Sequence, residues 1–256
     1  MNLQGKTALI TGASSGLGVD FARELAQRGA DLILTARRED RLEAVAQEMR
    51  ETYGVEAEVI ALDLGDPVTP QELYNRAKEQ GREVEILINN AGFGVYGPFP
   101  DTPWERTAAM LQLDIVSLTH LTKLFLEDML KRNSGYVLHV ASVAAYQATP
   151  SYAAYAAAKS YVLHFSEALH HELRDTNVIV SALSPGFTET EFFEVSGQKS
   201  TFFRRMSAMD SPTVARIGIK AMLSGKASKI SGFMNAFSAF GVRFIPRSWQ
   251  RSLAGL

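Results

Sequence analysis

The chain has 256 residues, of which 46% are hydrophobic and 21% charged, a composition typical of a globular domain with one sizeable core. Its net charge of -2 gives no electrostatic basis for binding nucleic acid, and the absence of cysteine excludes structural disulfides and thiolate metal sites. The first residues do not form a secretory signal, and no apolar run approaches the roughly 20 residues of a membrane span, so we expect a cytoplasmic protein.

Short apolar runs alternate with amphipathic stretches along the chain. The runs expected to be strands are residues 7–11, 31–35, 58–62, 85–89, 136–142 and 178–184. Thr69 and Thr102 each precede a proline and stand three residues before a glutamate, which is typical of a helix start. The alternation predicts a doubly wound α/β fold with helices on both faces of a parallel sheet. No shift in composition divides the chain, so we expect one domain over residues 1–256, with an amphipathic tail from about 236 to 256.

A glycine-rich turn, TGASSGLG, follows the first expected strand and contains Gly12, Gly16 and Gly18. An apolar helical pattern comes directly after it. Glycines at this place let the backbone turn tightly and approach a pyrophosphate, which the N-terminus of the helix then stabilises. The turn predicts a dinucleotide-binding site.

Two arginines, Arg37 and Arg38, follow the second expected strand, where an NAD site typically has an acidic residue. A carboxylate would repel a ribose 2′-phosphate, whereas a guanidinium can bind it with two hydrogen bonds. The pair favours NADP(H), with Arg37 the better candidate, although one arginine can simply be a solvated loop residue. Asp63, after the third strand, can bond the adenine amino group or cap a turn.

Four further motifs complete an ordered set: Asn89-Asn90-Ala91-Gly92, Ser142, Tyr155 with Lys159, and Pro185-Gly186. From the first strand to about residue 235, the chain resembles the short-chain dehydrogenase/reductase family. The resemblance implies a Rossmann-like fold with a seven-stranded parallel sheet, a nicotinamide cofactor, and a homodimer or homotetramer packed through the helices near Asp114 and Tyr152. Matched by motif, the cofactor-binding residues would be Gly12, Ser14, Ser15, Gly16, Leu17, Gly18, Arg37, Arg38, Asp63, Leu64, Asn90, Ala91, Gly92, Tyr155, Lys159, Pro185, Gly186 and Thr188.

Ser142, Tyr155 and Lys159 would be the catalytic set of such an enzyme. Hydride addition places negative charge on a carbonyl oxygen, so a proton donor (Tyr155) and a hydrogen-bond donor (Ser142) are needed there. A lysine ammonium about 4 Å from a tyrosine, at an effective dielectric near 20, contributes about 4 kcal/mol and would lower the tyrosine pKa of about 10 by roughly three. We therefore expect Lys159 to lower the pKa of Tyr155 and to bind the nicotinamide ribose. Taken singly, each residue can be structural; their joint spacing favours catalysis.

Asp114 departs from the family pattern, which usually has an asparagine at this position in a proton relay from the lysine. An ionised aspartate accepts hydrogen bonds but cannot donate them, and its charge favours the charged form of a nearby lysine. We include Asp114 in the catalytic set. Either the relay operates with an altered pH dependence, or the match of Asp114 to the family's asparagine is wrong by one helical turn.

In this family, the loops after the fourth, fifth and sixth strands form the substrate pocket. In this chain, those loops are rich in aromatic residues. The expected substrate-binding residues are Ser142, Phe93, Tyr146, Tyr152 and Phe187, with Tyr96, Phe99, Phe192 and Phe193 as further candidates. Some of these aromatics can instead belong to the core or to an interface. With no arginine cluster in these loops, we expect an uncharged hydrophobic ketone or aldehyde, or the corresponding alcohol. The five histidines lack metal-ligand spacing, so no metal is expected.

The end of the chain carries Phe233, Phe237, Phe240 and Phe244 at helical spacing and a second series of Arg243, Arg247 and Arg251. Such a pattern can mark a helix lying on a membrane. A packed tail or a subunit interface accounts for the phenylalanines equally well, and peripheral membrane contact is not the favoured interpretation.

These features together favour an NADPH-dependent oxidoreductase that interconverts a carbonyl and an alcohol. The alternatives are a non-catalytic dinucleotide-binding sensor or partner protein on the same fold, and an NADP-bound epimerase or dehydratase.

Overall fold

A seven-stranded parallel sheet, in the order β3-β2-β1-β4-β5-β6-β7, forms the centre of the protein. The computed structural model describes residues 1–79, 81–188, 208–246 and 249. The strands are β1 (Thr7–Thr11), β2 (Asp31–Ala36), β3 (Ala57–Ala61), β4 (Val84–Asn89), β5 (Gly135–Val140), β6 (Val178–Ser184) and β7 (Ser228–Ile230). The predicted doubly wound α/β fold is confirmed, with strand ends that differ from the predicted ones by one or two residues.

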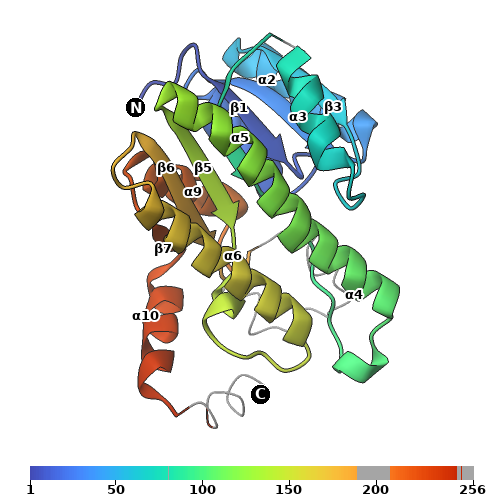
Figure 1. The fold of residues 1–256 in the computed structure, drawn as a ribbon, viewed down its shortest axis with the longest axis vertical. Coiled ribbons are helices and arrows are strands. Elements are labelled where there is room, and N and C mark those ends of the chain that lie inside the picture. Colours follow the sequence, from blue (N-terminus) through green and yellow to red (C-terminus); the bar gives the residue numbers. More distant parts are fainter. Residues whose placement is uncertain (80, 189–207, 247–248, 250–256) are drawn as a thin grey trace.

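Helices cover both faces of this sheet (Figure 1). On one face lie α1 (Leu17–Ala26), α2 (Glu39–Tyr53) and α9 (Ser211–Leu223). On the other lie α3 (Thr69–Glu79), α5 (Leu118–Arg132) and α6 (Ala153–Glu172). The remaining elements are α4 (Trp104–Leu111), α10 (Phe233–Gly241), a π-helical segment η2 (Gln112–Ser117), and the short 3₁₀ turns η1 (Phe99–Asp101), η3 (Val143–Tyr146) and η4 (Val242–Phe244).

The central strand β1 shows why the sheet needs both layers. All five of its residues are buried. Successive side chains point to opposite faces, so Ile10 packs with Phe21 of α1 while Leu9 packs with Leu73 of α3 and Phe125 of α5. Each apolar run therefore supplies two hydrophobic cores.

The two predicted helix starts differ in detail from the structure. Thr69 is the first residue of α3, and its hydroxyl donates to the carbonyl of Asp63 at 2.7 Å. Thr102 donates to the carbonyl of Phe99, and Pro103 is the residue that precedes α4, without a side-chain cap. Thr102 therefore closes the η1 turn instead of capping the helix.

The continuous helical segment Trp104–Arg132 is long and apolar enough, by length and composition, to cross a membrane. Its α5 part, however, packs on β4 and β5 with Leu121, Phe125 and Met129 buried. Figure 1 shows α5 lying across the sheet beside α6, which is the position of a core helix.

Candidate active site

A cleft of about 1040 Å³ lies at the carboxyl ends of the strands. The strand order reverses between β1 and β4, the place where open α/β sheets form their ligand sites. Of the residues predicted from the sequence, those that line this cleft are Gly12, Ser14, Ser15, Gly16, Leu17, Arg37, Arg38, Asp63, Leu64, Asn90, Ala91, Gly92, Phe93, Ser142, Tyr146, Tyr152, Tyr155, Lys159, Pro185, Gly186, Phe187 and Thr188. Gly18 and Asp114 lie behind its wall.

The glycine turn is shaped by close backbone contacts. Gly12 has φ +68°, and a Cβ there would lie 2.9 Å from the Cα of Ala91. Gly18 was predicted to bind cofactor; it lies outside the lining of the cleft, and a Cβ there would lie 2.1 Å from the carbonyl oxygen of Gly12. Gly16 precedes α1 without a side-chain cap, and Gly16 and Leu17 both line the cleft, so the N-terminus of the helix lies at the place where an anion site would need it.

Thr11 and Asn90 join the glycine turn to the loop after β4. The Thr11 hydroxyl accepts from the backbone N–H groups of Asn90 and Ala91, at 3.0 and 2.9 Å. The Asn90 side chain donates to the carbonyls of Thr11 and Gly12. Both loops are thereby held rigidly at the floor of the cleft.

The two arginines after β2 lie at one end of the cleft. The Arg37 guanidinium is 3.9 Å from the Asp63 carboxylate, and both side chains are exposed. Arg38 donates to the hydroxyls of Ser14 and Ser15, at 3.3 and 3.1 Å. Cationic and hydroxyl donors therefore converge beside the glycine turn, which fits a phosphate group.

Ser142, Tyr155 and Lys159 lie at the other end. Ser142 follows β5, and its Oγ accepts from the backbone N–H of Ala144 at 3.1 Å while the same side chain is a hydrogen-bond partner of Tyr155. The Nζ of Lys159 lies 5.8 Å from the centre of the Tyr155 ring and donates to the carbonyl of Val140 at 3.1 Å. Thirteen positions separate Ser142 from Tyr155, and four separate Tyr155 from Lys159. Ser142 follows β5, the other two belong to α6, and all three side chains meet at one wall of the cleft.

Asp114 lies directly behind Lys159, fully buried, in the π-helical segment η2. Its Oδ2 is 2.9 Å from Lys159 Nζ, and its Oδ1 accepts from the backbone N–H of Phe93. Gly92 packs on this pair, because a Cβ there would lie 2.8 Å from Oδ1 of Asp114. Asp114 and Lys159 are therefore a buried ion pair, and an ammonium with three N–H donors keeps one beyond the two used by Asp114 and Val140.

The prediction that Lys159 lowers the pKa of Tyr155 was wrong for this arrangement. Burial and the nearby Asp114 carboxylate raise the pKa of Tyr155 well above its ordinary value, although the Ser142 hydrogen bond opposes them. Desolvation also raises the pKa of Asp114 against the opposing effect of Lys159. The physical reason is that Asp114 balances the lysine charge, leaving desolvation to decide the protonation of the phenol.

Aromatic residues line the substrate side only in part. Tyr152 immediately precedes α6, lines the cleft, and lies 5.5 Å from Tyr155 between ring centres. Tyr96 packs on Tyr152 from outside, and neither Tyr96 nor Phe99 is on the cleft wall. Phe192 and Phe193 lie outside the described residues.

Sequence reasoning missed one side of the cleft. Asn235, Ser238, Ala239 and Val242, from α10 and the start of η4, line it. Their spacing of three, four and seven residues is that of one helix face. This spacing is readable in the sequence, but the phenylalanines on the opposite face of the same helix form the more conspicuous pattern.

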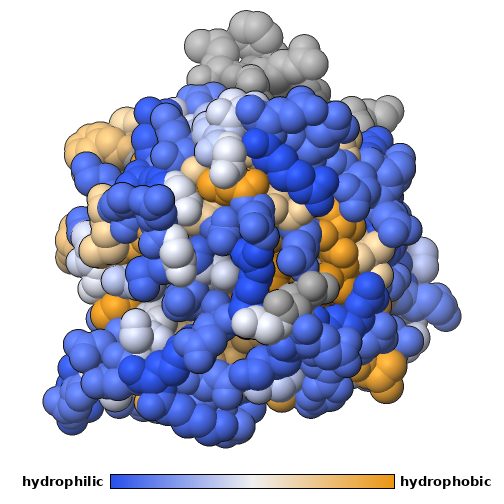
Figure 2. Space-filling model, turned by 90° about the horizontal axis from the view of Figure 1, so that it is seen from above, coloured by the Kyte–Doolittle hydropathy of each residue, from blue (hydrophilic) through white to orange (hydrophobic). Residues whose placement is uncertain are grey.

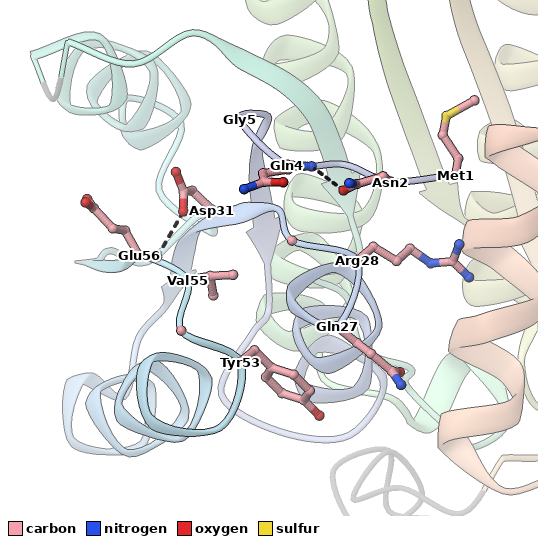
Figure 3. Close-up of a pocket in the computed structure, with 12 residues that line it drawn as sticks. Met1, Asn2, Gln4, Gly5, Gln27, Arg28, Asp31, Tyr53, Val55 and Glu56 are labelled. Atoms are coloured by element: carbon pink, nitrogen blue, oxygen red, sulfur yellow. Dashed lines mark hydrogen bonds between the residues drawn. The ribbon is translucent and has the colours of Figure 1, made fainter.

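A second depression, of about 740 Å³, lies at the amino ends of the strands (Figure 3). Its polar groups are largely engaged with one another: Asp31 accepts from the backbone of Glu56 at 2.9 Å, and Asn2 accepts from the backbone of Gln4. Arg28 is paired with Glu24. This depression offers no convergent set of catalytic groups. Over the part of the chain that the structure describes, no three His, Cys, Asp or Glu side chains gather as metal ligands would.

Comparisons with known proteins agree with this geometry. The family model for short chain dehydrogenase matches residues 6–201. A very-long-chain 3-oxoacyl-CoA reductase of Anas platyrhynchos is 35% identical over 198 residues, which are 75% of this chain but only 62% of that protein, less than two thirds of its length. The solved short-chain dehydrogenase of Sphingobium yanoikuyae in complex with NADPH is 30% identical, with a TM-score of 0.84 over 93% of this chain and 94% of that one. A short-chain dehydrogenase/reductase of Burkholderia phymatum in complex with NAD is 25% identical, with a TM-score of 0.86 over 98% and 97%.

Proposed function

The chain belongs to the short-chain dehydrogenase family, and from that premise we propose that it is an NADPH-dependent oxidoreductase that interconverts a carbonyl and an alcohol. One observation carries the proposal. A single cleft has Ser142, Tyr155 and Lys159 at one end and Arg37 and Arg38 at the other.

The residues present fit a nicotinamide dinucleotide. The crowded Gly12 backbone leaves no room for a side chain in the turn, and the N-terminus of α1, whose positive dipole end favours an anion, follows it. Arg37 and Arg38, without an acidic residue directly after β2, support a preference for a 2′-phosphate and hence for NADP(H). When bound, the nicotinamide supplies the hydride.

The protein's own groups would handle the oxygen and the proton. Tyr155 donates its hydroxyl proton to the carbonyl oxygen as negative charge develops, and Ser142 donates a hydrogen bond to the same oxygen. The raised pKa of Tyr155 keeps the phenol protonated at neutral pH, which suits it to act as an acid. Lys159 binds a ribose hydroxyl with its remaining N–H.

The substrate side supports an uncharged hydrophobic ketone or aldehyde. Phe93, Tyr146, Tyr152 and Phe187 line the cleft next to Ser142. Burying apolar surface against these rings would hold a substrate without a charged anchor. The name of the acyl-CoA reductase relative gives a 3-oxoacyl-CoA, which has a ketone on an apolar acyl chain but a charged coenzyme A group, so it supports the apolar part of this substrate class and not the absence of charge.

The proposal is tested by following NADPH and NADH absorbance with a panel of ketones and aldehydes for wild type and Tyr155→Phe. We expect oxidation of NADPH by wild type and a loss of at least about 100-fold in the variant, since proton transfer contributes about 10²–10⁴-fold. Tyr161→Phe is the matched control: Tyr161 lies on the same helix but bonds Thr119 outside the cleft.

Other outcomes separate the alternatives. Tight NADPH binding without turnover of any carbonyl compound would contradict the proposal and support a non-catalytic sensor. Conversion of substrate without net NADPH oxidation would instead support an NADP-bound epimerase or dehydratase.

A further inference from the structure

Helix α10 exposes its phenylalanines and presents Asn235, Ser238 and Ala239 to the cleft. Phe233, Phe237, Phe240 and the following Phe244 are between 56% and 82% exposed, and Ala239 is the one residue of the helix that is buried. The rings contact each other in the pairs Phe233–Phe237 and Phe240–Phe244. An ordinary core-facing helix has the opposite orientation, so within the described residues a packed tail does not account for this aromatic stripe, Phe233, Phe237, Phe240 and Phe244.

The chain segment that carries the aromatic stripe is basic. All 28 acidic residues of the chain lie before residue 211, whereas seven of its 26 basic residues lie after it. Arg243, between two stripe positions, is exposed, and so is Lys229 in the strand β7 on which α10 packs. Trp249, a residue type common at membrane–water interfaces, is 67% exposed.

We propose that α10 and η4 dock on an anionic lipid surface through the aromatic stripe, with the basic residues contacting lipid phosphates. Exposed phenylalanines on an uncharged helix enter the acyl boundary, and flanking cations are attracted to anionic headgroups. A symmetric contact between two copies would bring the same basic residues face to face, which the charge distribution disfavours.

Helix α10 lies between the proposed lipid-binding surface and the cleft. Asn235, Ser238, Ala239 and Val242 line the cleft on the inner side of the helix that carries the aromatic stripe outside. Figure 1 shows α10 beyond the end of the sheet at which η3 and α6 begin. The face at the opposite end, seen in Figure 2, is mostly hydrophilic with small separate apolar patches. Docking through α10 would therefore place the cleft next to the lipid.

The test measures co-sedimentation of the full chain with vesicles of phosphatidylcholine alone and of an equal mixture of phosphatidylcholine and phosphatidylserine. We expect binding to the mixed vesicles that weakens with salt. The double variant Phe237→Ser, Phe240→Ser should bind at least about tenfold more weakly, because each exposed ring contributes apolar burial. Val68→Ser removes an equally exposed apolar side chain before α3 and should bind as wild type does.

A second readout uses the two tryptophans of the chain. In Trp104→Phe, only Trp249 remains, and its fluorescence should shift to shorter wavelength with mixed vesicles. No binding of wild type to mixed vesicles, or equal binding of the double variant, would overturn the proposal. A smaller assembly in solution for the double variant, without vesicle binding by wild type, would assign the stripe to a subunit interface instead. These readouts need neither cofactor nor turnover, so they are independent of the proposed enzymatic activity.

Discussion

At the scale of single residues, the buried pair of Lys159 and Asp114 is the feature that most affects the chemistry. The two charged groups are 2.9 Å apart, and the exposed fractions of their side chains are 6% and 0%. The opposite charges of this buried pair largely cancel at Tyr155. Lys159 therefore lowers the pKa of Tyr155 less than an unpaired cation would. The proton-relay role predicted for Asp114 is thereby open to a direct experiment.

Asp114→Asn should retain activity and shift the pH profile of alcohol oxidation. The carboxylate raises the pKa of Tyr155; without it, the phenolate that serves as the base forms at lower pH, and the rising limb of the profile should move down by about one pH unit or more. Asparagine keeps an oxygen for the Phe93 N–H. Steady-state rates between neutral and alkaline pH provide the measurement, with Asp128→Asn on α5 as the control. An unchanged profile would contradict the relay role.

Arg37→Ala should weaken the binding of NADPH and leave the binding of NADH nearly unaffected. A hydrogen bond to a charged group is worth about 1.5–3 kcal/mol, so the KM for NADPH should rise about 10- to 100-fold. The exposed contact with Asp63 adds little by itself. Arg41→Ala, on α2 outside the cleft, is the control. A wild type that prefers NADH would refute the interpretation of Arg37.

At the scale of elements, helix α1 is seated on the glycine turn by direct backbone contact. A Cβ at Gly18 would lie 2.1 Å from the Gly12 carbonyl oxygen, and backbone cannot move aside as a flexible side chain does. The helix whose N-terminus lies at the cleft therefore depends on glycine at a position that does not itself line the cleft.

Gly18→Ala should destabilise the fold by about 1–3 kcal/mol, the usual cost of overpacking, and should also weaken NADPH binding. Urea unfolding and cofactor titration measure the two effects. Gly241→Ala is the matched control, because its Cβ would meet nothing within 4 Å and its backbone is helical; the change there should stay within about 1 kcal/mol. Equal behaviour of the two variants would contradict the packing role of Gly18.

At the scale of the whole molecule, a buried polar network joins β4, β5, α5 and α6. The ring nitrogens of His139 lie 2.9 Å from Thr122 Oγ1 and 2.8 Å from Ser166 Oγ, and Asn89 donates to Thr122. Burial lowers the pKa of His139 to about 3. The imidazole is thus neutral in the folded protein under ordinary conditions.

Stability should fall as the pH drops below about 6.5. The unfolded chain takes up a proton at His139 near its ordinary pKa of about 6.5, while the folded state resists until about 3, so stability is complete above 6.5 and declines by at most about 1.4 kcal/mol per pH unit toward 3. His139→Gln should be less stable at pH 7.5 but show a shallower decline. Urea midpoints at pH 7.5 and 5.0 measure this, with the exposed His164→Gln as control. Parallel slopes for His139→Gln and wild type would contradict the assignment.

The sequence by itself determined six of the seven strands and which residues are candidates for catalysis, because both depend on local patterns. Apolar runs such as residues 7–11 must be buried on both faces, and the motifs around Gly12, Ser142 and Tyr155 specify where each strand ends and each helix begins. The apolar pattern did not predict strand β7, because Ser228–Ile230 is only three residues long and has a lysine at its centre.

Only the tertiary structure decided what depends on residues distant along the chain. It brought Asp114 to 2.9 Å from Lys159, and burial of Tyr155 together with the Asp114 charge raised the pKa of Tyr155 instead of lowering it. It also oriented α10, whose sequence fits a core helix, a subunit interface or a membrane surface equally well. The spacing of side chains defines two helix faces, but which face meets solvent follows from the packing of that helix on β7 and η3.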